Sequence, residues 1–495
     1  MPTATTYLSE DIHNKIPKHE KIVRDKKINL GEFTVLAFLK TLATTKKQLL
    51  PVAFAILLTL FFLATEPAWG KPGGSDSDEK TMPEEPWDAH IQFTYLGQKK
   101  SSFKAAYSGT NSLSPDEENP YSFTSTLYFG ARAWQGAEFY FNPEMISAFP
   151  ASGLHGLGGL TNGEQQKSST SQPVYYLARA YLRQSFSFGD EKLPVEASLN
   201  QMGGLVDKRR LVLTIGKISI VDIFDNNLYS HDARTQFANW SFLDSAAYDY
   251  AGDAQGYTLG ATIEFYFDDW VFRAGRFEGP KESNGQALDP NVLDHYGDQI
   301  EIEHAHTFYD QPGKFRLLGF RNQEVMGNFE DAINFASVNG GTPDVANVRR
   351  LNIKYGYGIS LEQSLSADLG VFFRASLSDG KSETYSFTEV ENSITGGVVT
   401  NCNYWRRGLD RLGFAFAQNE ITAIHQKYLA QSGLGAFIGD GQLNYRPERI
   451  LEVIYNMNLY KTTWLSLGVQ RIDNPAYNAD RGPITVSTLR FHAEL

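Results

Sequence analysis

The alternation of apolar and polar residues along short segments constrains the fold of this chain more than any other feature. Residues 448–460 show it best: one face carries Leu451, Val453, Tyr455, Met457 and Leu459, and the other carries Glu452, Asn456 and Asn458. A period of two places successive side chains on opposite faces of a strand. The sequence therefore predicts an all-β protein. A soluble sandwich would turn the apolar face inward, whereas a barrel behind an export signal would turn it toward lipid.

A candidate export signal lies well inside the chain. The apolar segment 49–64 follows Lys46 and Lys47 and precedes the small residues Ala68 and Gly70. A basic region, an apolar core and an Ala-x-Gly site are typical of a cleavable secretory signal. A transmembrane anchor is the alternative, but the segment is shorter than the ~20 residues that a spanning helix needs. We assign residues 48–70 to a signal peptide and expect the mature chain to begin after them.

The segments around this signal differ in composition from the rest of the chain. Residues 1–47 form a polar extension of mixed charge, and the sequence leaves open whether it is translated or results from a misassigned start. Residues 71–86 are rich in Gly, Ser and Asp, which predicts a disordered linker. No linker divides residues 87–495, so we expect them to form a single β-barrel.

The overall composition excludes several classes of protein. The mean hydropathy is −0.34 and no other segment approaches the length of a membrane helix, which excludes a helical membrane protein. A net charge of −12 gives no indication of a nucleic-acid partner. The single cysteine, Cys402, excludes an internal disulfide framework. Aromatic residues make up 13% of the chain, an excess that the aromatic girdles of a membrane barrel would accommodate.

The alternating pattern predicts about sixteen strands, an even number as bacterial barrels require. Their expected ranges are 88–98, 121–133, 137–146, 174–186, 210–221, 256–267, 270–278, 298–309, 314–324, 349–365, 369–379, 393–405, 411–421, 448–460, 463–471 and 483–495. Short and long connections alternate between these strands, which is typical of periplasmic turns and external loops. The connection near 187–209 is an exception, because it should be a periplasmic turn and yet is long.

Strand alternation also predicts which charged residues face the lumen, since a Lys or Arg on the lipid face costs about 2–4 kcal/mol at the bilayer midplane. The inward set is Arg179, Arg183, Glu264, Arg350 and Arg374. In residues 174–186 the predicted lipid face is Tyr176, Ala178, Ala180 and Leu182. Two places break the alternation. Lys217 shares the face of Leu213 and Ile215, which predicts a bulge or a position near an interface, and Ile484 and Val486 are out of phase with Leu489 and Phe491.

Residues 216–257 carry the most specific motif in the chain. They contain Gly-Lys at 216–217, Phe-Asp at 224–225, Asn-Trp at 239–240 and Asp-Tyr-Ala-Gly-Asp at 249–253. This motif, with Asn162-Gly163-Glu164 and shorter segments as far as residue 483, resembles the carbohydrate-selective porin family of the OprB type. The resemblance covers about residues 87–495. It implies an outer-membrane barrel of sixteen strands that passes sugars by diffusion, without cofactor or energy input.

The segment 222–255 is too long to be an ordinary connection, and structureless loops of this length are uncommon unless they are functional. Folded into the lumen, it would narrow the pore. Sugar hydroxyls would then meet inward wall residues and loop residues, and the predicted set is Arg179, Arg183, Asn226, Tyr229, His231, Asp232, Arg234, Asn239, Glu264, Arg350 and Arg374. The alternative is that these residues only attach the loop to the wall.

Other chemistry has weak support in the sequence. Glu301 and Glu303 share one face of a strand, as a hydrolase pair would, but paired carboxylates also line ordinary pores. His304 and His306 also lie two residues apart on this strand, as metal ligands could, but alternation places them on the face opposite Glu301 and Glu303. We therefore predict no catalytic residue, metal site or cofactor. An outer-membrane barrel enzyme and an adhesin or structural barrel remain the alternatives to a sugar channel.

The predicted partners follow from this class of protein. They are small sugars, outer-membrane lipid and the machinery that assembles outer-membrane barrels, while the sequence leaves a monomer and a homotrimer both open. The chain ends in Leu495, whereas strands that signal this assembly usually end in an aromatic residue.

Overall fold

A closed antiparallel barrel accounts for most of the part of the chain that the computed structural model describes, residues 85–495 except 169 and 388. The predicted signal peptide, the N-terminal extension and nearly all of the predicted linker lie outside these residues. Within them, the barrel has sixteen strands, and β1 pairs with β18 to close it. Each predicted strand overlaps one observed strand, so the predicted fold class is confirmed. The barrel strands are β1 (Trp87–Lys100), β2 (Tyr121–Trp134), β3 (Ala137–Phe149), β4 (Val174–Ser187), β7 (Arg210–Ile218), β8 (Thr258–Phe267), β9 (Trp270–Phe277), β10 (Tyr296–Phe308), β11 (Gln311–Met326), β12 (Arg350–Ser364), β13 (Leu369–Ser378), β14 (Asn392–Cys402), β15 (Arg407–Glu420), β16 (Glu448–Tyr460), β17 (Thr463–Asp473) and β18 (Ile484–Glu494).

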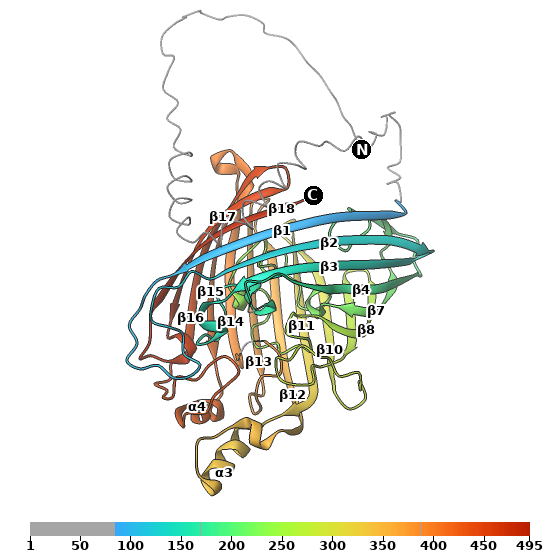
Figure 1. Ribbon diagram of the computed structural model, residues 1–495. Helices are drawn as coiled ribbons and strands as arrows, with labels where there is room; N and C mark the ends of the chain where they lie inside the picture. The colour runs from blue at the N-terminus through green and yellow to red at the C-terminus, as the bar shows by residue number, and fades with distance from the viewer. Residues whose placement is uncertain (1–84, 169, 388) are drawn as a thin grey trace, which may run out of the picture. The chain divides into compact units, whose positions relative to one another are not determined.

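The two ends of the barrel differ in how the strands are connected. Helices α3 (Phe329–Asn339) and α4 (Ala423–Ala430) lie at the end with long loops, and the C-terminus lies at the opposite end (Figure 1). The connection between β4 and β7 lies on the side of the short turns and contains a separate hairpin, β5 (Lys192–Val195) and β6 (Gly204–Asp207). Seven short 3₁₀ helices occur in the connections of the described part: η1 (Ala151–Leu154), η2 (Gln165–Lys167), η3 (Ile220–Asp222), η4 (Trp240–Phe242), η5 (Val345–Val348), η6 (Asn403–Trp405) and η7 (Pro475–Tyr477). None of the helices in the described residues is both long and apolar enough to span a membrane.

The observed burial follows the alternation that the sequence predicts. In β16, Leu451 and Val453 are 37% and 43% exposed, whereas Glu452 between them is buried. The same alternation exposes Leu, Ile, Val and Phe side chains along most barrel strands. An apolar outer face with polar groups inside is the arrangement that lipid around a barrel requires.

A bulge in β4 makes one part of the predicted lipid face wrong. Asn142 pairs with Arg179 and the next residue, Pro143, pairs with Leu177, so Ala178 is an extra residue. An extra residue reverses the alternation on one side of it. Tyr176 consequently points inward, where its hydroxyl donates a hydrogen bond to Glu144. Arg179 keeps the inward orientation that was predicted for it.

The two other irregularities have different causes. The pairing of β7 with β8 has no register shift at Lys217, and the ammonium group lies 3.5 Å from Asp253 in the following connection. The β7–β8 pairing thus shows no bulge at Lys217, which lies at the loop end of the strand, where Asp253 offers its charge a partner. Ile484 and Val486 point inward and are buried, because the loop end of the lumen is filled with folded loops that form an apolar core there.

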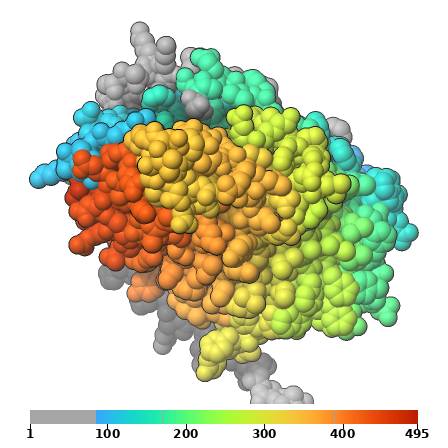
Figure 2. All heavy atoms as spheres, turned by 90° about the horizontal axis from the view of Figure 1, so that it is seen from below, coloured from blue at the N-terminus to red at the C-terminus, as the bar shows by residue number. Residues whose placement is uncertain are grey.

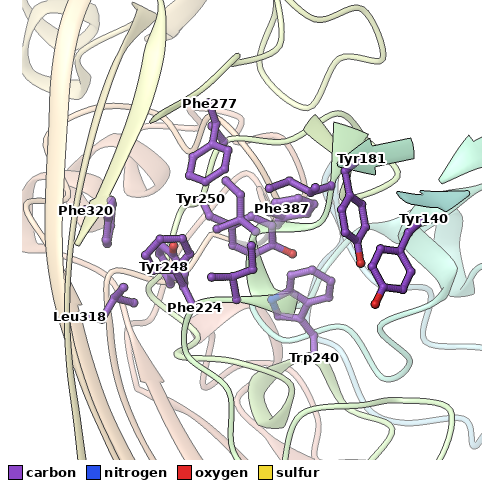
Figure 3. Packing of buried hydrophobic residues seen from close by; sticks show 14 of the residues in the cluster. Tyr140, Tyr181, Phe224, Trp240, Tyr248, Tyr250, Phe277, Leu318, Phe320 and Phe387 are labelled. Carbon is purple, nitrogen blue, oxygen red and sulfur yellow. The ribbon is translucent and has the colours of Figure 1, made fainter. Parts of the chain in front are cut away.

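Loops fill much of the barrel interior and pack around buried aromatic residues. One cluster joins Leu318 and Phe320 of the wall to Trp240, Tyr250 and other loop residues (Figure 3). The view onto the loop end shows segments from distant parts of the sequence side by side (Figure 2). Folded loops thus narrow the lumen. Most of the loop contacts with the inner face of the barrel come from the connection between β7 and β8, residues 219–257. We refer to these residues as the inner loop.

Candidate functional site: a cavity beside the inner loop

Wall carboxylates hold the inner loop by its backbone. The hydrogen bonds are accepted by Glu301 from the N–H of Asp225 (2.6 Å), by Glu362 from Leu228 (2.7 Å), and by Glu452 from Ala238 (2.8 Å) and Asn239 (3.0 Å). All three glutamates are buried. Hydrogen bonds to a charged acceptor contribute about 1.5–3 kcal/mol each, so this set fixes the path of the loop through the lumen.

Arginines hold the loop in the complementary way, by donating to its carbonyl groups. The Arg374 guanidinium donates to the carbonyl of Ser230 at 2.7 Å, and that of Arg490 donates to the carbonyls of Ala233 and Gln236 at 2.6 and 2.7 Å. Both wall arginines are 1% exposed. The guanidinium groups of both arginines therefore serve mainly a structural role, because they donate to backbone carbonyl groups that would otherwise lack a hydrogen bond.

One arginine reaches in the opposite direction, from the loop to the wall. Arg234 donates to Glu144 of β3 and to Gln92 of β1, each at 2.8 Å. Its guanidinium also lies 2.8 Å from Glu164 in the loop between β3 and β4. Arg234 therefore ties three separate parts of the chain together at the side of one cavity. The carboxylates of Glu144 and Glu164 raise the pKa of Arg234 despite its burial, so it stays charged.

This cavity, of about 290 Å³, lies between the inner loop and strands β1 to β4. We refer to it as the lumen cavity. Its walls also include Gly163, Glu164, Gln166 and Lys167, the buried Phe387, and Leu199 and Asn200 of the connection between β4 and β7. Seven stretches of sequence from different parts of the barrel thus converge on one space.

One wall of the lumen cavity is aromatic. Trp240 stacks on Phe387 with ring centroids 5.2 Å apart, and Tyr250 lies 4.3 Å from the same ring. Figure 3 shows these rings together in the middle of the buried cluster. The N-cap at Asn239, whose side chain accepts from the N–H of Ser241, starts the short helical turn that carries Trp240. Aromatic rings of this kind offer a flat apolar surface with polar atoms only at the edge.

The other wall residues are mostly polar and include paired charges. Arg179 donates to both oxygens of Asp222 at 2.5 and 2.6 Å, and its guanidinium lies over the ring of Tyr257 at 5.3 Å. Lys167 lies 3.1 Å from Glu164. Because each cation has a carboxylate beside it, the wall presents many donors and acceptors with little net charge.

Asp244 is the exception to this pairing. Its carboxyl group lines the cavity, and among the described residues it has no hydrogen-bond or ion-pair partner. Burial, reinforced by the neighbouring charge of Asp225, raises the pKa of Asp244 well above its usual value. The carboxyl group of Asp244 thus gives the cavity a polar group that no other side chain of the described residues satisfies.

The predicted site residues lie in four kinds of place. Arg179, His231, Asp232 and Arg234 line the lumen cavity. Arg183 lies beside it, with its guanidinium 5.0 Å from the ring of Tyr140. Others serve the attachment of the loop or the rigidity of the wall: Asn239 and Arg374 lie in the contacts described above, Tyr229 bonds to Ser364 at 2.7 Å, and Glu264 pairs with Arg273 at 3.1 Å. Asn226 is exposed, and Arg350 pairs with Asp331 of α3.

Several cavity residues were absent from the predicted set. Five residues that line the cavity have no role in the sequence prediction: Lys167, Trp240, Asp244, Tyr257 and Phe387. The sequence did indicate part of this set, because Asn162-Gly163-Glu164 and the motif around Tyr250 belong to the segments that resemble the carbohydrate-selective porin family. Phe387 gave no signal, since it comes from a separate connection between β13 and β14.

Metal or hydrolase chemistry finds no geometric support in the described residues. They contain no cluster of three or more His, Cys, Asp or Glu side chains that could hold a metal ion. Glu301 and Glu303 share one face, as predicted, but both pair with Arg273, at 2.7 and 3.1 Å. His304 lies against the exposed Trp270 on the other face, with the two rings tilted by 46°.

A closed antiparallel barrel with an apolar outer face and a lumen narrowed by an inward-folded loop defines a porin. Comparison with protein families matches residues 110–495 to the carbohydrate-selective porin, OprB family. The chain belongs to this family, which makes it an outer-membrane carbohydrate porin, a class of channel.

Comparison with solved structures supports the fold through a Pseudomonas putida structure. The chain is similar to the high-pH structure of Pseudomonas putida OprB, with 15% sequence identity, a TM-score of 0.64, and coverage of 83% of this chain and 94% of that one. It also matches the outer-membrane protein OmpT of Vibrio cholerae, with 8% identity, a TM-score of 0.43, and coverage of 84% and 100%. Comparison with curated protein sequences finds no match.

Proposed function

We propose that sugars cross the barrel by passive diffusion through the lumen cavity, between the aromatic wall at Trp240 and the polar wall at Arg179. The observation that carries this proposal is that stacked aromatic rings and paired charges line the same space. A sugar ring has an apolar face of C–H groups and a rim of hydroxyl groups. The aromatic wall suits the first and the paired charges suit the second.

The charge balance of the cavity supports a neutral solute. Arg179 is neutralised by Asp222, and Lys167 by Glu164. A site built to select anions or cations would leave one sign in excess, as rings of like charge do in ion-selective pores. Paired groups instead supply hydrogen bonds at fixed positions. Each such contact is weak in a hydrated pore, which suits a channel that must release its solute.

The route to the membrane forms part of the proposal. The apolar segment 49–64 and the Ala68-x-Gly70 site support export by a cleavable signal and insertion by the outer-membrane assembly machinery. N-terminal sequencing of the protein from outer membranes tests this. A chain that still carried residues 1–60 would contradict it. Mass measurement in detergent decides between a monomer and a homotrimer.

Block of single-channel current by sugars tests the proposed path. We expect reversible block by neutral sugars in planar bilayers, and weaker block in Trp240→Ala. Loss of a stacking surface should lower the apparent affinity about tenfold, which corresponds to about 1.4 kcal/mol. Trp405→Ala is the matched control, because Trp405 is 53% exposed outside the lumen cavity. Equal sugar block in the wild type and in Trp240→Ala would contradict the proposed path.

A further inference from the structure

The connection between β4 and β7 is longer than the barrel needs. Ser187 at the end of β4 pairs directly with Arg210 at the start of β7. A turn of two residues is enough to join antiparallel strands in that position. Residues 188–209 instead form an insertion that contains β5 and β6, on the side of the short turns. The channel function described so far leaves this insertion without a role.

The tip of the insertion folds back into the barrel. Ser198 and Gln201 exchange backbone hydrogen bonds of 3.0 Å, which closes a tight turn with Leu199 and Asn200 at its centre. Asn200 has a φ of 57°, a left-handed conformation that asparagine tolerates better than most residues. The turn therefore has a defined shape, and its two central residues both line the lumen cavity.

Contacts with the barrel wall hold the tip in this position. Arg183 of β4 donates to the carbonyl of Asn200 at 3.3 Å, and Arg132 of β2 donates to that of Gly203 at 2.8 Å. The N–H of Met202 donates to the Tyr140 hydroxyl at 3.2 Å. The Met202 side chain is 4% exposed and packs with Tyr140 and Tyr181, which lie side by side in Figure 3.

Asn200 offers an unused polar atom at this point. Its amide oxygen Oδ1 is enclosed and has no hydrogen-bond partner among the residues that the structure describes. An enclosed acceptor without a donor is costly, so it is a natural partner for a solute hydroxyl. The Arg179 guanidinium and Trp240 line the same space.

We propose that the insertion 188–209 forms the periplasmic floor of the lumen cavity, and that Leu199 and Asn200 determine which sugars leave it and how fast. This inference rests on the proposed path of sugars through the lumen cavity. The floor makes the exit narrower than the wall alone would, and Asn200 adds a final hydrogen bond to a departing sugar. The insertion thus acts on specificity at the exit, whereas the inner loop acts at the constriction.

Cysteine labelling tests the position of the floor without any sugar. The chain has a single cysteine, Cys402, which is buried, so an introduced cysteine provides the accessible thiol. We expect Asn200→Cys to lose about half of its single-channel current or more when a bulky water-soluble methanethiosulfonate is added on the periplasmic side. Gln201→Cys is the matched control, since Gln201 is exposed and absent from the cavity lining. Equal effects in the two variants, or none in either, would overturn the proposal.

Removal of the insertion tests its effect on transport. Replacement of residues 188–209 by Asn-Gly joins Ser187 to Arg210 without a change of register. We expect conductance to rise about twofold, and sugars to dwell in the pore for a time shorter by about tenfold. An unchanged conductance in a folded barrel would overturn the proposed floor. If no sugar blocks the wild-type channel, the proposed path fails, while the labelling and conductance results still decide the position of the floor.

Asn200→Ala tests the specificity role directly. It should shorten the dwell time of sugars added from the periplasmic side about threefold and leave ion conductance near the wild-type value, whereas Gln201→Ala should change neither. Dwell times that remain unchanged in Asn200→Ala, with a labelled Asn200→Cys that does block, would leave the floor in place and overturn the role of the amide.

Discussion

Arg234 of the inner loop and Glu144 of β3 lie 2.8 Å apart, with less than a tenth of either side chain exposed. This pair joins the middle of the loop to the wall of the barrel. Gln92 and Glu164 extend the contact to β1 and to the loop between β3 and β4. The position of the inner loop, and with it the width of the pore, depends on a charge pair that water reaches poorly.

Arg234→Ala should release the inner loop from the wall. Removal of one partner from a buried ion pair costs about 3–5 kcal/mol, because the other charge stays behind without compensation. We expect a folded barrel with larger and noisier single-channel conductance and weaker sugar block. The control is Arg209→Ala, whose exposed pair with Asp268 is screened by water and should leave the channel unchanged. A conductance trace identical to that of the wild type would argue against this role for Arg234.

Arg179→Ala should change ion selectivity as well as sugar block. Its loss leaves Asp222 unpaired in the lumen cavity, so the channel should become more selective for cations. Sugar block should weaken about tenfold, or about 1.4 kcal/mol. The reversal potential in a salt gradient measures the first effect. The double variant Arg179→Ala with Asp222→Asn should restore the selectivity, and a reversal potential that does not move in the single variant would contradict the prediction.

Arg374 and Arg350 should respond differently to the same substitution. Arg374→Ala leaves buried carbonyl groups of the inner loop without a donor, at about 1–3 kcal/mol for each unsatisfied group. Arg350 is more than half exposed and pairs with Asp331, so Arg350→Ala should be nearly neutral. Thermal unfolding in detergent and single-channel noise measure both. We expect Arg374→Ala to give a destabilised channel with noisy current, and Arg350→Ala to behave as the wild type does.

The stability of α4 should depend on pH through His425. The imidazole lies 2.7 Å from Glu391 and 3.8 Å from Glu389, and it stacks on Phe329 of α3. Burial alone would lower the pKa of His425, but the two carboxylates outweigh burial and the more distant Lys354, so the pKa is raised. The stabilisation is therefore complete below the unfolded pKa of about 6.5 and is lost as pH rises through the raised folded pKa.

Hydrogen exchange across α4 checks this dependence. After correction for intrinsic exchange rates, protection in the wild type should fall as the pH rises above about 6.5. His425→Gln keeps a hydrogen-bonding side chain but cannot titrate in this range, so its protection should be lower near pH 6 and independent of pH. Protection in the wild type that rises with pH would contradict the sign of the effect.

Alternation along strands was enough to predict the barrel, because lipid outside and polar groups inside impose opposite demands on neighbouring residues. It placed Glu452 and Arg374 inward from sequence alone. It was wrong at Tyr176, because a single extra residue at Ala178 reverses the order of faces and leaves no mark in composition. It was ambiguous at Ile484, because it assumed a wet lumen, whereas folded loops make part of the lumen apolar.

The candidate site was only partly predictable for a similar reason. Arg179, His231, Asp232 and Arg234 reach the lumen cavity as the sequence suggested. Phe387 arrives from a connection far along the chain, and no local pattern records which loops meet in space. The position of the tip of the insertion at residues 188–209 was unpredictable for the same reason. The unusual length of the insertion is visible in the sequence. The return of its tip into the barrel depends on contacts with Tyr140 and Arg132 that only the folded chain brings together.

The wall glutamates bind backbone N–H groups of the inner loop, and every residue type except proline supplies such a group. The anchor points at Asp225, Leu228, Ala238 and Asn239 therefore place no demand on side-chain chemistry. An inner loop from another porin of similar length, or one with randomised side chains between these points that keeps Arg234, should dock in the same barrel. The barrel is therefore a scaffold that accepts different inner loops. Exchange of the inner loop alone should change which solute the channel passes, while the barrel stays the same.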